Sequence, residues 1–471
     1  MRPWLSRTLL IVGTVGMCWA GTIWYWRASN RMPSTADLLV YLLILPLVLL
    51  LAFWGGKKLW PLLAGAPVAA SAAAAVPAPA TAAPVSVRAA PLDVIASALR
   101  MPHGESAAEL AEAMAADEVR PELDAELNGN DGFPILSGRI AAVDEAAQED
   151  AMASWLAQHG HGARFDAEQW RALALGSAVM TELAQQAMLH QALPAYVKAA
   201  PAARVALPLP MLQFLPLWPA EWSLPQRQVA GSWFLHLLVQ QGWPAERATL
   251  SLAGERKDAS PASLIGQLAL QGAQEGLPCL AILFACASYV GELSVTDWAA
   301  RGILLTSKNP HGQIPGEGAA GLLLADAAQA ALLTDNTAVQ LHGAGAGRRA
   351  SSADAGGRVN ADLLGSLSAQ ALHATDAAQV SLITADNDLR ASRMSEMMEM
   401  AQGALPQIDL SSQVMSVAVV CGHAGAASAL AALALAHHAA DADASHVLCI
   451  SNHDPFQRSA VLVRPSSSVP A

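Results

Sequence analysis

The sequence is poor in charged and aromatic residues, and its charge is mainly acidic. Only 14% of its 471 residues are charged and 5% are aromatic, and 27 Lys and Arg stand against 39 Asp and Glu, a formal net charge of -12. Because phosphate recognition needs clustered basic side chains, this composition excludes nucleic acid as a partner. The five cysteines are irregularly spaced and lie mostly in apolar runs, so neither a disulfide framework nor a CxxC zinc site is indicated.

Apolar residues are abundant instead, at 53% of the chain, and the mean hydropathy of +0.32 is high for a protein that does not meet lipid. Residues 8–26 carry no charge and would form a helix about 28 Å long, which matches the hydrocarbon core of a bilayer. Residues 38–54 form a second uncharged run. We therefore expect a two-helix transmembrane hairpin over residues 1–60, with spans at about 8–26 and 38–54. A cleaved signal peptide is less consistent with the first run, which ends in Trp and Tyr like an interfacial belt.

The charges that flank the two runs slightly favour both ends in the cytoplasm, which would place the large domain there; a periplasmic domain is the alternative. Residues 61–91 are rich in Ala and Pro and have too little bulky apolar surface to pack, so they are expected to form a linker. The folded domain is expected to begin near Leu92.

From residue 92 onward, segments with helical spacing alternate with short apolar segments, which predicts an α/β fold. The expected helices are 106–116, 145–158, 225–241, 261–274, 360–372, 394–402 and an alanine-rich helix from about 423 to 440. The expected strands are 249–252, 279–287, 319–325, 337–341, 379–384, 415–421 and two that flank a turn at 452–458. The aromatic segment 208–228 and the glycine-rich segment 341–358 are predicted to be loops. The small residues of the alanine-rich helix suit a position between two sheets.

Four segments resemble the thiolase-like superfamily, and in particular the β-ketoacyl synthases. The corner PGEGAA at 315–320 leads into the strand at 319–325, as a GEGA corner does in that family, and ARGILLTSKNP at 300–310 resembles the segment before it. SLITADNDLRASRMSE at 381–396 and SVAVVCGHAGAAS at 416–428 resemble the two segments that carry catalytic residues in the family. The resemblance implies a layered α-β-α-β-α fold over residues 92–471, made of two related halves at about 92–330 and 331–471.

The catalytic residues of the family are mostly absent at the matching positions. The first catalytic His falls on Ala385 and the catalytic Lys on Ala418, whereas the second His is kept as His423 and an acidic residue is kept as Glu396. Glu317, in the glycine-rich corner, would accept hydrogen bonds from neighbouring amides, and the glycines around it would allow a tight turn and close backbone approach. His423, Glu396 and Glu317 are candidate relics of a family active site. For His423 the favoured alternative is a structural role, as a helix cap or a hydrogen-bonded core residue, and a structural role is likewise favoured for Glu317.

The nucleophilic cysteine of the family should begin the helix at 261–274, where the chain reads ERKDASP at 255–261 and contains no cysteine. Acyl transfer needs an activated thiolate, and condensation needs imidazole donors for the enolate. If the chain is active all the same, the candidate nucleophiles are Ser260, Cys286 and Cys421, with His423 as the base. Losing several members of such a constellation removes most of its catalysis, because they act as a unit.

No metal and no cofactor are expected. A group of potential metal ligands in the last fifty residues fits no closed zinc spacing: Cys421, His423, His437, His438, His446, Cys449, His453 and Asp454. The chain is therefore interpreted as a membrane-tethered, catalytically degenerate ketosynthase-like protein, a scaffold or adaptor that presents its surface, or an emptied acyl pocket, to another protein or a lipidic ligand. An active acyltransferase with an unconventional nucleophile is the alternative, and a membrane assembly component without a ligand is a third. The resemblance also implies a homodimer and, with the hairpin, a bacterial inner membrane.

Overall fold

The computed structural model describes residues 90–116, 119–159, 162–256, 259–333, 339–355, 360–372 and 377–466. The expected transmembrane hairpin and all but the last two residues of the expected linker lie outside these ranges. Within them, no helix is both long enough and apolar enough to cross a bilayer. The first element is strand β1, which begins at Leu92, where the folded domain was expected to start.

Ten strands form one mixed sheet in the order β10-β9-β11-β12-β8-β1-β7-β6-β4-β5. The sheet consists of two sets of five strands: β1 with β4–β7, and β8–β12. When the strands of each set are numbered 1 to 5 along the chain, both sets have the spatial order 3-2-4-5-1, counted from the outer edge of the sheet inward. The strands are β1 Leu92–Arg100, β4 Leu212–Leu217, β5 Ala248–Leu250, β6 Leu280–Ser288, β7 Glu317–Ala325, β8 Val339–Arg348, β9 Val380–Ala385, β10 Val414–Ser416, β11 His446–Ser451 and β12 Gln457–Pro465; a separate hairpin joins β2 Glu122–Asn128 to β3 Pro134–Ser137. The two sets meet where three residues of β1 pair with β8, so one topology occurs twice.

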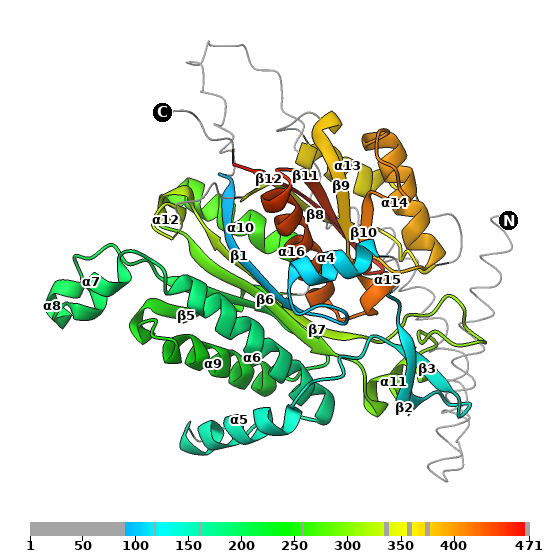
Figure 1. The fold of residues 1–471 in the computed structure, drawn as a ribbon, viewed down its shortest axis with the longest axis horizontal. Coiled ribbons are helices and arrows are strands. Elements are labelled where there is room, and N and C mark those ends of the chain that lie inside the picture. The colour runs from blue at the N-terminus through cyan, green and yellow to red at the C-terminus, as the bar shows by residue number, and fades with distance from the viewer. Residues whose placement is uncertain are drawn as a thin grey trace, which may run out of the picture. The chain divides into compact units, whose positions relative to one another are not determined.

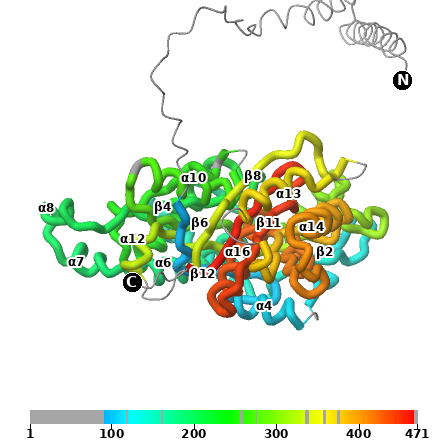
Figure 2. The backbone as a smooth tube through the Cα atoms, turned by 90° about the horizontal axis from the view of Figure 1, so that it is seen from above, coloured from blue at the N-terminus to red at the C-terminus, as the bar shows by residue number. Residues whose placement is uncertain are grey.

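Helices cover both faces of each set of strands (Figures 1 and 2). The α-helices are α4 Ala107–Ala115, α5 Glu145–His159, α6 Ala167–Ala187, α7 Leu193–Lys198, α8 Pro201–Arg204, α9 Leu224–Gln240, α10 Pro261–Glu275, α11 Glu292–Ala300, α12 Ala327–Ala330, α13 Asp362–Ala371, α14 Ala391–Ala404, α15 Val417–Cys421 and α16 Ala426–Ala442. Helices α6 and α9 pack on the first set of strands, α13 and α14 pack on the second, and α10 and α16 share one core with strands of both sets. The arrangement is therefore the layered α-β-α-β-α architecture that the family resemblance implies.

Alternating side chains of the central strands feed two cores. In β6, Ala281, Leu283 and Ala285 point to the middle helices, whereas Ile282 and Phe284 point to α6 and α9. Both faces are buried, which explains the nearly continuous apolar run of this strand. Helix α16 lies between the two sets and is built mostly of alanine, because only small side chains fit where it is enclosed on several sides.

Three segments differ from expectation. The aromatic segment 208–228 contains β4, a strand hydrogen-bonded between β5 and β6. Strand β4 accommodates Pro216 because the pairing of β4 with β5 ends at Phe214, so no hydrogen bond to β5 is required at Pro216. The carbonyl of Pro216 lies next to Gly254 in the 3-10 turn Leu252–Glu255. The predicted loop at 341–358 is wrong over its first half, where β8 pairs with β12 as far as Arg348. The predicted strand 415–421 is wrong from Val417 onward: residues 417–421 form the short helix α15, since apolar runs of this length do not distinguish helix from strand.

Candidate functional site

The segment 381–396 runs from β9 through the loop after it into α14, and the segment 416–428 runs from the end of β10 through α15 into α16. Strands β9 and β11 run parallel and adjacent, with Ala385 beside Ile450, so the loops after both strands begin at the same edge. Asp386 accepts hydrogen bonds from the backbone N–H groups of Asn452 (2.9 Å) and His453 (3.2 Å) and from the hydroxyl of Ser451. One carboxylate at the end of β9 thus fixes the loop after β11.

The glycine-rich corner holds His423 by its backbone. The N–H of His423 donates to the carbonyl of Ile314 (2.8 Å), and its carbonyl accepts from the N–H of Gly316 (3.0 Å). A Cβ on Gly316 would lie 2.4 Å from the carbonyl oxygen of Cys421, so these two backbone segments approach too closely for any residue other than glycine at position 316. The glycines of this corner were expected to allow close backbone approach, and the position of Gly316 against Cys421 confirms it.

The imidazole of His423 lies in a stack of aromatic rings. Its ring centre is 4.1 Å from that of His453, and the two ring planes are 8° apart. Its ring centre is also 5.4 Å from that of Tyr289, in the loop after β6. Burial lowers the pKa of His423 well below its ordinary value, and the charges of His453 and Arg390 lower it further, against an opposing effect of Asp388. The Nδ1 atom is buried and has no hydrogen-bond partner in the described part of the chain. His423 is therefore held as a neutral ring at physiological pH.

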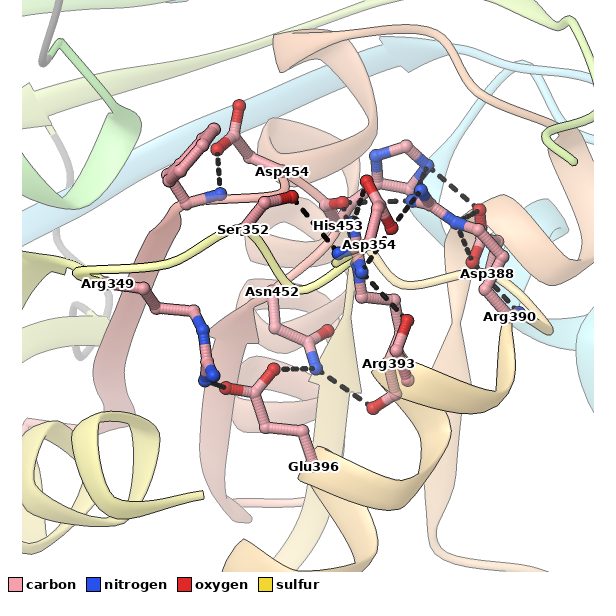
Figure 3. Close-up of polar contacts among 12 residues, drawn as sticks. Arg349, Ser352, Asp354, Asp388, Arg390, Arg393, Glu396, Asn452, His453 and Asp454 are labelled. Carbon is pink, nitrogen blue, oxygen red and sulfur yellow. Dashed lines mark hydrogen bonds and ion pairs between the residues drawn. The ribbon is translucent and has the colours of Figure 1, made fainter. Parts of the chain in front are cut away.

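His453 connects this stack to an ion network (Figure 3). Its Nε2 lies 3.2 Å from Oδ2 of Asp388, whose other close partner is the Nε of Arg390 at 2.8 Å. Burial alone would raise the pKa of Asp388, but the hydrogen bond and charge of His453, with the charge of Arg390, outweigh it and lower the pKa. Arg390 also donates to the carbonyl of His453 at 2.9 Å. The loop after β9 thus orients one ring of the stack.

Glu396, which the sequence resemblance singled out, is a buried carboxylate paired with two arginines. Its side chain is completely buried, and both carboxylate oxygens lie 2.8 Å from the Nε of Arg458, while Nη1 of Arg349 donates to Oε1 at 2.8 Å. Figure 3 shows Arg349 and Asn452 converging on this carboxylate. Arg349 belongs to the segment predicted to be a mobile loop, and its ion pair instead fixes the chain after β8 against α14.

Glu317 occupies a second buried site, on the first set of strands. One carboxylate oxygen accepts from Nη2 of Arg171 (2.6 Å) and from the N–H of Ile140 (2.8 Å); the other accepts from Nε of Arg171 (2.9 Å) and from the hydroxyl of Ser288 (2.9 Å). The carboxylate accepts four hydrogen bonds, including one from a backbone amide as expected for this residue. This arrangement ties β7 to α6 and to the chain that precedes α5.

The candidate nucleophiles do not join His423. Ser260 is the N-cap of α10, where its hydroxyl accepts from the N–H of Ser263 (3.2 Å), and no hydrogen bond or ring contact links it to His423 among the described residues. Cys286 lies among the outer-core side chains near Gly176, and Cys421 donates to the carbonyl of Pro102. Burial raises the pKa of both thiols, so neither is a thiolate at neutral pH.

The two alanines that the sequence resemblance aligned with catalytic residues, Ala385 and Ala418, are core residues. Ala385 is the last residue of β9 and pairs with Ile450 on one side and Ser416 on the other, and Ala418 is buried in α15. Neither methyl group can donate a proton. Among the residues that the structure describes, no group of three or more His, Cys, Asp or Glu side chains is arranged to hold a metal ion.

Sequence reasoning missed the partners of His423. His453 was considered only as one of several scattered metal ligands, and Tyr289 was not considered. The available signal was that polar residues directly follow the buried strands β9 and β11, whose carboxyl ends meet at one edge when they pair in parallel.

No family model and no curated protein matches the chain. Solved structures do resemble it. The ishigamide ketosynthase/chain length factor shares 15% identity at a TM-score of 0.51, over 80% of this chain and 99% of that one. An oxazolomycin ketosynthase domain of Streptomyces albus shares 13% at a TM-score of 0.52, over 81% and 75%. The module 6 ketosynthase of the bacillaene synthase of Bacillus subtilis shares 11% at 0.51, over 81% and 73%.

The fold is that of a ketosynthase domain. At these identities the likeness concerns the fold alone. Within the ketosynthase fold, the contacts of Glu396 and Glu317 are those of buried structural ion pairs, and His423 is the one imidazole that the sequence resemblance carried over.

Proposed function

We propose that the chain is a membrane-tethered protein of ketosynthase fold that does not catalyse condensation and acts as a scaffold or adaptor for a protein partner. The observation that carries the proposal is the state of the helix that should present the nucleophile. At the N-terminus of α10 stands Ser260, whose hydroxyl is used to cap its own helix. A capping hydroxyl of this kind has no base to remove its proton.

The groups that would assist a nucleophile are also missing. Ala385 and Ala418 present methyl groups where the family pattern has a His and a Lys, and the single remaining imidazole, His423, is neutral and stacked between rings. Catalysis by such a constellation depends on all members together, so the remaining His423 would contribute little by itself. The four described cysteines are buried, which removes the thiolate alternative.

A rigid surface supports the scaffold role. The loops after β9 and β11 are fixed to each other by Asp386, and ion pairs of Glu396 hold the segments behind them. Preorganised loops lose little conformational entropy when a partner binds. One of the similar structures is, by its name, a ketosynthase together with a chain length factor, which agrees with a fold that works in association. A homodimer, a bacterial inner-membrane location and a bound acyl or lipid ligand remain predictions of the same proposal.

The test is acyl transfer itself. The full-length chain, incubated with acetyl-, hexanoyl- and octanoyl-coenzyme A and with the matching acyl carrier protein thioesters, is expected to show no increase in intact mass. Alkylation of its cysteines after denaturation shows that the mass measurement detects adducts on this chain. A near-stoichiometric acyl adduct that disappears in Ser260→Ala, Cys286→Ala or Cys421→Ala would overturn the proposal and name the nucleophile of an active acyltransferase.

A further inference from the structure

One row of paired residues marks a common edge of the first set of strands. Asp93 of β1 pairs with Ala325 of β7, Ala325 with Leu280 of β6, Leu280 with Leu212 of β4, and Leu212 with Ala248 of β5. Strands β1, β4, β5 and β6 all begin at or next to this row and run away from it. We call it the amino edge; the loops that carry Tyr289, Asp386 and His453 lie at the other ends of their strands.

Both described ends of the chain are at the amino edge. Ala90, the first described residue, lies two residues before the start of β1, and β12 ends at Pro465, which pairs with Val339 at the start of β8. Val339 in turn pairs with Val94 of β1. Any segment that precedes residue 90 therefore leaves the folded domain from this edge.

The amino edge also exposes large apolar side chains. They precede β4 and β6 or lie at the ends of the helices that lead to this edge: Leu189, Val197, Val205, Met211, Leu270 and Leu277. Val205 is 85% exposed, Leu277 61% and Leu189 60%. Figure 1 shows helices α7 and α8, which carry or adjoin Val197 and Val205, projecting from the body of the domain. These side chains come from separate segments that all reach the same edge, and exposed apolar residues gathered on one side of a domain suit a surface that contacts a partner or lipid.

The projecting helices are fixed in place. Tyr196 of α7 is buried, and its ring faces the guanidinium groups of Arg204 and Arg247 at 5.3 and 5.2 Å. Arg204 is paired with Glu246 at 2.8 Å. The inner face of α7 is thus packed, and the neighbouring Val197 and Lys198 point outward on a rigid support.

We propose that the amino edge, with Leu189, Val197, Val205, Met211, Leu270 and Leu277, lies on the surface of a phospholipid bilayer. The inference rests on the proposed membrane tether, because the chain outside the described domain leaves from this same edge and carries the two membrane-length runs. Apolar side chains flanked by an exposed lysine and amphipathic helix ends suit the boundary between headgroups and acyl chains.

The edge opposite the amino edge carries the loops after β6, β9 and β11. The loops with Tyr289, Asp386 and His453 lie at the opposite ends of the strands, so a domain resting on its amino edge turns them away from the lipid. The exposed residues of these loops, Leu389 and Asp454, then face the aqueous phase, where a protein partner can reach them. One surface holds the domain on the bilayer and the other remains free for recognition.

The test places an environment-sensitive fluorophore at the two edges of the full-length chain. Cys18→Ser removes the one cysteine outside the described residues, and the four buried cysteines remain. An NBD group is attached at Val197→Cys or Val205→Cys on the amino edge. The matched controls are Leu293→Cys in α11 and Leu389→Cys after β9, which are 64% and 66% exposed at the opposite edge. Each variant is reconstituted in phosphatidylcholine vesicles, with and without nitroxide-labelled lipid.

NBD at positions 197 and 205 is expected to emit at shorter wavelength and to lose at least half of its fluorescence to the nitroxide lipid, with little change at 293 and 389. Water-like emission at all four positions of a chain that floats with vesicles would overturn this inference and leave the tether standing. A blue shift at 197 and 205 without quenching would overturn it in favour of a protein neighbour, such as a second copy of the chain. A chain that does not float with vesicles would refute the tether itself.

Discussion

The buried pair of Glu317 and Arg171 is expected to be one of the main stabilising contacts of the ketosynthase-like domain. The Glu317 side chain is completely buried and that of Arg171 is 10% exposed, and two parallel N–H···O bonds join them at 2.6 and 2.9 Å. Glu317→Gln removes the charge and offers an amide donor to groups that are already donors. The buried guanidinium then keeps only the half-exposed carboxylate of Glu145, at 3.3 Å, as an anionic partner. Breaking a buried pair in this way costs about 3 to 5 kcal/mol of the free energy of unfolding.

The measurement is the urea midpoint of the full-length chain, followed by tryptophan fluorescence. Asp297→Asn is the matched control, because it breaks an exposed ion pair with Arg301 in α11 and is expected to cost less than about 1 kcal/mol. A double variant, Arg171→Met with Glu317→Gln, should lose less than the sum of its single losses by about 1 to 3 kcal/mol. If Glu317→Gln unfolds at the same urea concentration as Asp297→Asn, the argument from burial is wrong.

Three further outcomes are expected. Gly316→Ala should cost about 1 to 3 kcal/mol, because its Cβ would meet the backbone of Cys421 at 2.4 Å, whereas Gly365→Ala in α13, with open space around it, should leave the urea midpoint equal or higher. Burial lowers the pKa of His437 from 6.5 to about 4, so the neutral ring contributes up to about 3 kcal/mol to the free energy of unfolding above pH 6.5, and this contribution is lost as the pH falls toward 4. His437→Gln should therefore flatten the decline of the urea midpoint with falling pH, and an unchanged slope would count against this role of His437. Burial raises the pKa of the Cys279 and Cys449 thiols to about 12, so iodoacetamide at pH 8 should modify neither until urea unfolds the chain, and rapid labelling of the folded chain would contradict the burial.

Local sequence pattern predicted the elements with a clear period. The apolar run of β6, the helix α10 after its proline, and the alanine-rich α16 appear in the structure close to their expected bounds. Each depends mainly on neighbouring residues, through helical spacing, a capping serine or an uninterrupted run of buried side chains. The absence of a nucleophilic cysteine before α10 was likewise visible in the sequence.

Elements whose identity depends on distant strands were missed. The aromatic segment 208–228 was predicted to be a loop, yet it contains β4, which tolerates Pro216 because its neighbour β5 is short at that point. The glycines of β8 suggested a loop, yet β12 supplies hydrogen-bond partners along this strand. In both cases pairing with another part of the chain outweighed local propensity.

The sequence by itself determined which chemical groups are available: alanines at 385 and 418, a serine at the start of α10, and the imidazole of His423 in the segment 416–428. Only the tertiary structure decided what those groups do. The carboxylate of Glu317 meets an arginine 146 residues away, and the ring of His423 meets that of His453 because two loops converge at one edge of the sheet. Such contacts join residues far apart along the chain, and neither spacing nor composition encodes them; they exist only once the sheet has brought its strand ends together.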